Sequence, residues 1–166
     1  LLIVNSVNDA PVLSAIANQT INEDETLSYE LDVLNVDNDM IFFNAVVDDN
    51  FTAIFSNNTL LVTPDINWSG SGLIIVSAFD GEYLSEQSFT LTVLPVNDAP
   101  ILDFIEGQEI DEDTSATVLL SGSDIDSDTL VFSADIDGNA LVDVSGLTLT
   151  VTPDADYNGT IAVTVY

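Results

Sequence analysis

The sequence repeats itself with a fixed offset of 89 residues. The pentapeptide VNDAP at 7–11 returns unchanged at 96–100, and positions 7–77 align onto 96–166 without a gap. More than a third of the aligned pairs are identical. A fixed period is typical of tandem structural units. We therefore predict an array of similar domains, and we expect the function to belong to the array.

The charge of the chain is entirely one-sided. It has 29 acidic residues and no Lys, Arg, His or Cys, which gives a net charge of −29. Such a chain repels the phosphates of nucleic acids and anionic membrane surfaces, because it has no basic group to replace their counterions. It also has no apolar run long enough to span a bilayer. Nucleic acid is therefore excluded as a partner, and direct membrane insertion is not expected.

The same composition removes most catalytic groups. Without His, Cys, Lys or Arg, the chain has no imidazole base, no thiol or amine nucleophile, and no cation to stabilise an anionic transition state. Only carboxylate chemistry of the glycosidase type remains. We therefore predict that the protein is not an enzyme. Because 46% of the residues are hydrophobic, the chain is expected to fold rather than to remain disordered.

Short segments of alternating apolar and polar residues lie between turn signals in the first repeat, and no helical periodicity is present. Seven such strands in about 85 residues predict an all-β fold, an immunoglobulin-like antiparallel β-sandwich. The predicted strands are 12–16, 27–33, 41–47, 51–55, 59–63, 73–79 and 88–93. The residues expected to face the core are Leu60, Val62, Ile74, Val76 and Ala78. Two aromatic residues at matching positions, Trp68 and Tyr157, are expected to be core or turn aromatics.

The offset also predicts the domain boundaries. Residues 1–6 correspond to the last strand of a preceding repeat, and the second repeat stops in the middle of a predicted strand, without equivalents of 78–98. The missing strand is explained either by truncation of the chain or by strand donation from another chain, since an open sheet edge is normally avoided. The expected organisation is 1–6 (end of a preceding repeat), 7–11 (linker), 12–94 (repeat 1), 95–100 (linker) and 101–166 (truncated repeat 2).

Acidic and amide residues recur at matching places: in the linkers, before the first long strand, in an Asp-x-Asp turn after it, and at later turns. In a sandwich, the Asp-x-Asp turn and Asp80 lie at the end that holds the incoming linker, whereas Glu23 and Asp65 lie toward the outgoing one. Residues 23, 65, 97, 98, 126 and 128 are therefore expected to converge at the junction of the repeats. The candidate ligands are Asn8, Asp9, Glu23, Asp37, Asp39, Asp65, Asp80, Asn97, Asp98, Asp126 and Asp128.

Converging carboxylates repel each other by roughly 0.7 kcal/mol per pair at about 6 Å, even in water. The chain contains no basic side chain that offsets this repulsion. Calcium takes 6–8 oxygen ligands from carboxylates and carbonyls, so the pattern predicts calcium binding. The alternative is that these residues only form turns and confer solubility. An EF-hand at 124–128 is disfavoured, because Thr129 stands where that loop needs glycine.

These motifs resemble tandem cadherin-like repeats of large bacterial surface proteins and adhesins, of the bacterial immunoglobulin-like or tandem-95 type. The resemblance rests on the VNDAP linkers, on the TPDxx(W/Y)xG segments at 63–70 and 152–159, and on AFDG at 78–81. It implies calcium at the junctions, held by the linker Asn-Asp, the Asp-x-Asp pair, the Glu before the strand and Asp80. Ser6 and Pro95 replace the first linker Asp of cadherins, and Asn67 replaces a Glu. The resemblance therefore implies one or two ions per junction rather than three.

The function expected from these observations is a calcium-rigidified extracellular segment of a large adhesin or surface filament, which serves as a spacer and in cell adhesion. Its expected partners are neighbouring repeats of the same chain, other copies of itself, and cell-surface or matrix ligands. One alternative is a self-assembling extracellular fibre that uses strand donation between chains. The other is a carbohydrate-binding accessory module that uses Trp68 and Tyr157.

Overall fold

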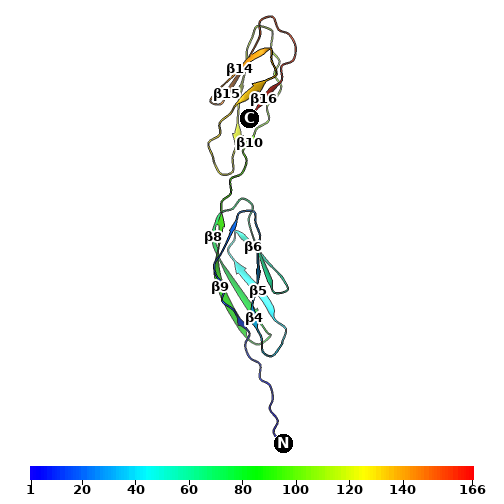
Figure 1. Ribbon diagram of the computed structural model, residues 1–166, viewed down its shortest axis with the longest axis vertical. Coiled ribbons are helices and arrows are strands. Elements are labelled where there is room, and N and C mark those ends of the chain that lie inside the picture. The colour runs from blue at the N-terminus through cyan, green and yellow to red at the C-terminus, as the bar shows by residue number, and fades with distance from the viewer. The chain divides into compact units, whose positions relative to one another are not determined.

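The computed structural model describes residues 1–166 as two compact units, Leu1–Val96 (unit 1) and Asn97–Tyr166 (unit 2). Every regular element is a β-strand (Figure 1), which confirms the predicted all-β class. The structure contains no helix with the length and apolarity that a membrane crossing requires.

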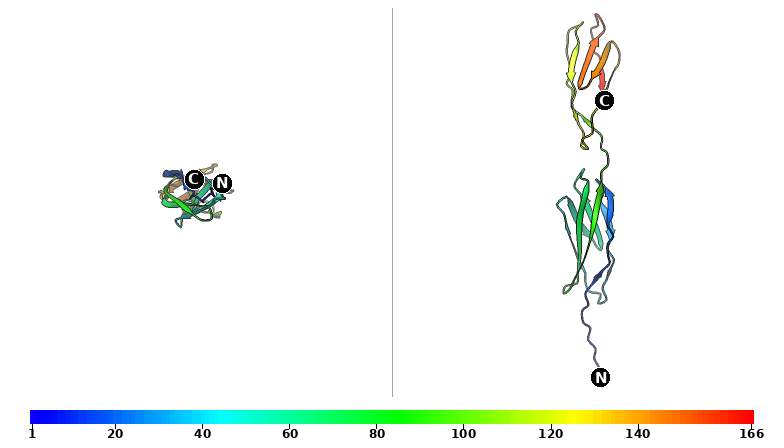
Figure 2. Two further views of the ribbon diagram at one scale, coloured as in Figure 1. Left: turned by 90° about the horizontal axis from the view of Figure 1, so that it is seen from below. Right: turned by 90° about the vertical axis from the view of Figure 1, so that its left-hand side faces the viewer.

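Unit 1 is a sandwich of two main sheets (Figures 1 and 2). One sheet has the order β2 (Gln19–Asn22), β9 (Leu84–Leu94), β8 (Gly70–Phe79) and β5 (Phe42–Val47). The other has the order β3 (Leu27–Glu30), β7 (Thr59–Pro64) and β6 (Phe51–Ser56). A short pair is formed by β1 (Val12–Leu13) and β4 (Val33–Leu34). All pairings are antiparallel except that of β2, which runs parallel to β9.

The core of unit 1 lies between these sheets. Successive residues of a strand point to opposite faces, so alternating apolar residues of β7 and β8 meet in the interior. The five inward-facing residues predicted from the sequence all have 0% exposure, which confirms this prediction. From β9 the core also receives Phe89, Leu91 and Val93, each at most 2% exposed.

The strand predicted at 27–33 is divided into β3 and β4. The N–H of Leu31 donates to the carbonyl of Asn58, and the carbonyl of Asp32 accepts the N–H of Ser14. At this point the chain therefore changes its partner from β7 to β1. The side chains still alternate through the break, since Leu27 and Leu31 are buried and Tyr29 and Val33 are partly buried. Strand β2 was not predicted, because three of its four residues are polar.

The aromatic residue of the TPDxx(W/Y)xG segment packs over the glycine of the same segment. A Cβ atom added at Gly70 would lie 2.7 Å from Trp68 Cζ2. Trp68 packs against the core and meets the edge of Phe51 at a centroid distance of 5.0 Å, which confirms it as a core aromatic. In unit 2 a Cβ at Gly159 would lie 2.7 Å from Tyr157 Oη. The glycine thus makes room for the ring.

Unit 2 repeats most of this plan at the offset of 89 residues. One sheet has the order β11 (Ala116–Leu119), β15 (Thr148–Pro153) and β14 (Ala140–Ser145). Two pairs complete it: β13 (Ala134–Ile136) with β16 (Val163–Val165), and β10 (Ile101–Leu102) with β12 (Gly122–Ser123). Counterparts of β2 and β9 are absent from the described chain. Consequently Val163 and Val165 are only partly buried, whereas the equivalent Ile74 and Val76 are fully buried.

Candidate metal site

The linker that enters unit 1 is held by two of the predicted carboxylates. Asn8 Nδ2 donates to Asp80 Oδ2 at 3.1 Å, and the N–H of Asp9 donates to Asp37 Oδ2 at 2.7 Å. Asp37 lies in the turn after β4, and Asp80 lies in the turn between β8 and β9. Unit 1 therefore brings these four predicted residues to the end that holds the incoming linker, as expected from the strand directions.

The other oxygen of Asp80 organises its own turn. Its Oδ1 accepts the backbone N–H groups of Tyr83 at 2.7 Å and Glu82 at 2.8 Å. These two bonds, that of Tyr83 first, hold the pKa of the Asp80 carboxyl below its ordinary value of 3.8. One carboxylate oxygen thus fixes the β8–β9 turn and the other faces Asn8.

The depressed pKa of Asp80 predicts a pH-dependent contribution to stability. A carboxylate whose pKa is lower in the folded state stabilises the fold above its unfolded pKa and loses this effect as the pH falls through the folded pKa. We expect Asp80→Asn to destabilise unit 1 at neutral pH, with a difference from wild type that shrinks below about pH 4. Urea unfolding followed by Trp68 fluorescence measures it. A difference that does not change between pH 7 and pH 3 would contradict this role.

Asn8 also contributes a polar atom that no protein group satisfies. Its Oδ1 is buried and has no hydrogen-bond partner, although its Nδ2 is bonded to Asp80. A buried acceptor without a partner costs about 1–3 kcal/mol. An amide oxygen beside a carboxylate is a donor set that suits a hard cation such as calcium. The residues at this linker therefore offer oxygen ligands of the kind that calcium takes.

The opposite end of unit 1 holds Glu23, the one charged side chain in the buried set, with an exposure of 6%. Its N–H donates to the carbonyl of Leu94, and its Oε1 accepts the N–H of Val96. Asp65 is exposed, and its turn is tied to the neighbour of Glu23 by a 3.0 Å bond from the N–H of Asn67 to Asp24 Oδ1. Both predicted ligands therefore lie near the outgoing linker of unit 1.

One of the two linker contacts of unit 1 recurs in unit 2. The N–H of Asp98 donates to Asp126 Oδ2 at 2.7 Å, as that of Asp9 does to Asp37. Asn97 Nδ2 donates to the carbonyl of Asp98 at 2.8 Å. The bond from the linker Asp to the Asp-x-Asp turn is therefore common to both units, whereas the linker Asn has a different partner in each.

A further polar residue shapes each Asp-x-Asp turn. Asn35 Oδ1 accepts the N–H of Asp37, and its Nδ2 donates to the carbonyl of Asp39. In unit 2, Asp124 Oδ1 accepts the N–H groups of Asp126 and Asp128. Asn35 was not among the predicted site residues. Its signal in the sequence is an Asn or Asp two positions before the first Asp of the turn, the spacing of an Asx turn.

The predicted set is divided between the units, with Glu23 and Asp65 in unit 1 and the predicted residues from 97 onward in unit 2. The structure contains no group of three or more Asp or Glu side chains arranged to hold a metal ion. Asp37 and Asp126 instead each accept the backbone N–H of a linker Asp through a side-chain oxygen.

Residues 96–166 match the family model described as Cadherin-like domain. Among solved structures, the chain is similar to Drosophila N-cadherin EC1-4, with 17% identity, a TM-score of 0.54, and coverage of 95% of this chain and 45% of that one. It is also similar to human Protocadherin-24 EC1-2, form II, with 11% identity, a TM-score of 0.55, and coverage of 95% and 86%.

An endo-fucoidan hydrolase of glycoside hydrolase family 107 has 15% identity and a TM-score of 0.47, with coverage of 98% of this chain and 29% of that one. The chain thus spans less than half the length of the N-cadherin and hydrolase chains. No curated protein matches the sequence. The cadherin structures share the β-sandwich fold of this chain, and the first repeat aligns with the matched second one without a gap. Residues 96–166 therefore match the cadherin-like family, and the chain has the immunoglobulin-type β-sandwich fold that cadherin repeats share.

Proposed function

We propose that the chain is a calcium-binding extracellular repeat segment, a structural module of an adhesin or surface filament. The observation that carries the proposal is the buried Oδ1 of Asn8, which has no partner in the protein and lies on the side chain that bonds to Asp80. A cation satisfies this oxygen and reduces the repulsion among the nearby carboxylates. The chain itself has no Lys, Arg or His with which to do so.

Calcium would act by ordering the linkers. In each unit an Asp of the linker donates its N–H to the Asp-x-Asp turn, so the linker is already anchored at one point. The Asn8 oxygen, the carboxylates of Asp9, Asp37 and Asp80, and backbone carbonyls would supply the remaining ligands, with water completing the shell. Because the ion binds the ordered linker better than the disordered one, its binding free energy favours the ordered state.

The proposed location follows from the fold family and from the metal. Cadherin-like domains are extracellular modules, and extracellular calcium sites bind with dissociation constants of about 10⁻⁴–10⁻³ M. The proposed partners are the neighbouring repeats of the parent chain and ligands on the cell surface or in the matrix. No enzymatic activity is proposed, because the chain lacks most catalytic groups.

The proposal is tested with the whole chain in calcium and in EGTA. Calorimetric titration is expected to show calcium binding in the 0.1–1 mM range, and small-angle scattering is expected to show a larger radius of gyration with calcium. The variant Asp126→Ala with Asp128→Ala should bind less calcium and scatter more like the chelated protein. A matched control, Asp135→Ala with Asp143→Ala, removes two exposed carboxylates from strands β13 and β14.

The control should behave as wild type, since it changes the net charge equally but leaves the linkers intact. Two results would overturn the proposal. One is an absence of calcium binding in the titration. The other is a radius of gyration that does not differ between calcium and EGTA.

The carbohydrate-binding alternative has less support. Trp68 packs against the core and the edge of Phe51, so its ring contributes to interior packing rather than to a binding platform. The hydroxyl of Tyr157 donates to the carbonyl of Thr160 at 3.1 Å within its own turn.

A further inference from the structure

The four-stranded sheet of unit 1 carries apolar side chains on the face that points away from the core. In β8, Ile74, Val76 and Ala78 are fully buried between the sheets, so the residues that alternate with them lie on the outer face. The same alternation applies to the neighbouring strands β5 and β9 (Figure 1). We call the apolar residues of this face the outer patch; they are Phe42, Val46, Leu73, Ile75, Phe79 and Leu84.

Strand pairing arranges the outer patch in two rows. In the first row, Phe42 pairs with Phe79, and Phe79 pairs with Leu84. In the second row, Val46 pairs with Ile75, and Leu73 follows on the same face of β8. Ile75 is partly buried, and the other five side chains are 38–59% exposed. An apolar area of this kind on the surface of a water-soluble domain is typical of a site for interaction with another molecule.

The second repeat shows that the fold does not require this apolar surface. Val46 and Ile75 correspond to Asp135 and Thr164, which pair with each other in the same way. Leu73 likewise corresponds to an alanine, Ala162. Unit 2 therefore keeps the strand pairing while its outer face is more polar. The apolar residues of unit 1 are thus not needed for the pairing of these strands, and a binding role accounts for them.

One carboxylate lies between the two apolar rows. Glu86 pairs with Ser77, which pairs with Asn44, and these three residues form a polar row across the middle of the outer patch. Glu86 is the only charged residue of the three rows and is exposed. A partner that covers the patch without a cation would bury an unpaired carboxylate, which is strongly unfavourable. The partner therefore needs a basic group between its apolar side chains.

We infer that the outer patch binds a segment of another protein in which apolar side chains flank a lysine or an arginine that faces Glu86. The inference goes beyond the proposed calcium-binding role and does not depend on calcium. It assigns an interaction surface to unit 1 and defines the partner by its pattern of apolar and basic side chains.

Charge complementarity favours a basic partner over a second copy of this chain. The chain has no Lys, Arg or His, so a second copy offers no group that pairs with Glu86. Two chains that each carry a net charge of −29 also repel each other. The same negative field attracts a basic partner and accelerates its association.

The test uses the whole chain in EGTA and a synthetic peptide, LTLTKTLTL, with an acetylated N-terminus and an amidated C-terminus. When the peptide is extended, its leucines and its lysine share one face, at the same spacing as the rows of the outer patch. In an NMR titration the peptide is expected to shift the amide signals of β5, β8 and β9 and to leave those of unit 2 unchanged. Calorimetry measures its dissociation constant.

Two control peptides separate the apolar and the basic contributions. The peptide TTTTKTTTT keeps the lysine but has no leucine, and LTLTETLTL keeps the leucines but has a glutamate at the centre. Each is expected to bind at least about tenfold more weakly than LTLTKTLTL, the factor that corresponds to the loss of one good contact. No binding of LTLTKTLTL, or equal binding of either control peptide, would overturn the inference.

A double variant of the chain tests the location of the site. Val46→Asp with Ile75→Thr introduces the pair that unit 2 has at the same positions, so it is compatible with the fold. It is expected to bind LTLTKTLTL at least about tenfold more weakly, although it carries one more negative charge. The matched control, Ile54→Asp with Leu61→Thr, makes the equivalent change at a pair on the other sheet and should bind as wild type does. Equal affinities of the two variants would overturn the inference.

The role of Glu86 is tested by Glu86→Gln. This variant is expected to bind LTLTKTLTL about threefold more weakly and LTLTETLTL more tightly than wild type does, because it removes one ion pair and one like-charge contact. Asp143→Asn makes the same change of charge on β14 of unit 2 and should alter neither affinity. If Glu86→Gln also leaves both affinities unchanged, Glu86 does not face the basic group. A dimer of the wild type in sedimentation that Val46→Asp with Ile75→Thr abolishes would identify a second copy as the occupant and overturn the inference.

Discussion

Replacement of Leu60 by alanine is expected to lower the free energy of unfolding of unit 1 by about 3–5 kcal/mol. Leu60 has 0% exposure and is the second residue of β7, with its side chain in the core between the two sheets. Its truncation leaves a closed cavity, so the lost transfer free energy is increased by a cavity cost. Urea unfolding followed by Trp68 fluorescence measures this change, since Trp68 is the single tryptophan and lies in unit 1.

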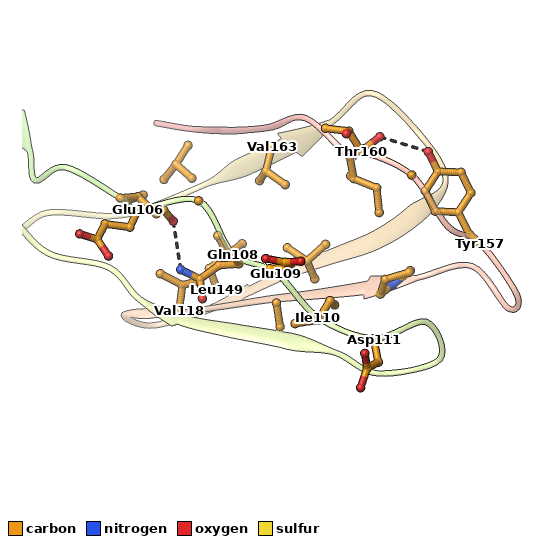
Figure 3. A pocket seen from close by; sticks show the side chains of 18 of the residues that line it. Glu106, Gln108, Glu109, Ile110, Asp111, Val118, Leu149, Tyr157, Thr160 and Val163 are labelled. Carbon is orange, nitrogen blue, oxygen red and sulfur yellow. Dashed lines mark hydrogen bonds between the residues drawn. The ribbon is translucent and has the colours of Figure 1, made fainter.

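The matched variant is Leu149→Ala, at the same position of the second repeat. Leu149 is 3% exposed but lines a groove of about 910 Å³ in unit 2 (Figure 3), so its truncation enlarges an existing space and creates no closed cavity. We expect a loss of about 2 kcal/mol, which is close to the transfer term alone. Hydrogen exchange of the amides of unit 2 measures it. A loss equal to that of Leu60→Ala would contradict an open groove.

Periodicity and the repeat together predicted most of the fold. Alternation in β7 and β8 identified the inward-facing residues because both strands are central and each has one face on the core. The parallel pairing of β2 was not predictable from its own residues. Its position depends on β9, about 70 residues later in the chain, and a polar four-residue edge strand carries almost no local signal.

Packing details depended on contacts that only the structure provides. In unit 1 a Cβ at Gly72 would lie 2.3 Å from Phe51 Cε2, so the phenyl ring occupies the space that a side chain at 72 would need. In unit 2 the same two positions are Ile161 and Ala140. The larger residue of the pair is Phe51 in unit 1 and Ile161 in unit 2. The summed side-chain volume of the two positions is therefore similar, and cores tolerate such an exchange well. The alignment alone shows two unrelated substitutions.

For the candidate site, the sequence predicted which end of unit 1 each residue occupies but not the atomic contacts that it makes. Strand directions correctly placed Asp37 and Asp80 at the incoming linker and Glu23 near the outgoing one, because these assignments require only the order of the strands. The burial of Asn8 Oδ1 and the role of Asn35 were not predictable. Both depend on which oxygen or nitrogen of an amide faces a neighbour, and strand order contains no information on that.

Addition of residues 78–94 after Tyr166 is expected to complete unit 2 and to stabilise it by at least about 2 kcal/mol, the amount associated with burial of one large apolar side chain. Tyr166 aligns with Ser77, so the added segment continues the repeat in register. The equivalents of Phe89, Leu91 and Val93 should fill the groove, bury Val163 and Val165, and pair residues 108–111.

Urea unfolding monitored by hydrogen exchange should show a higher midpoint and a steeper dependence on urea, because more surface becomes buried in the folded state. A control extension with Asp at the three inward-facing positions should give neither effect. Stabilisation by the control extension would show that the groove does not select an apolar strand.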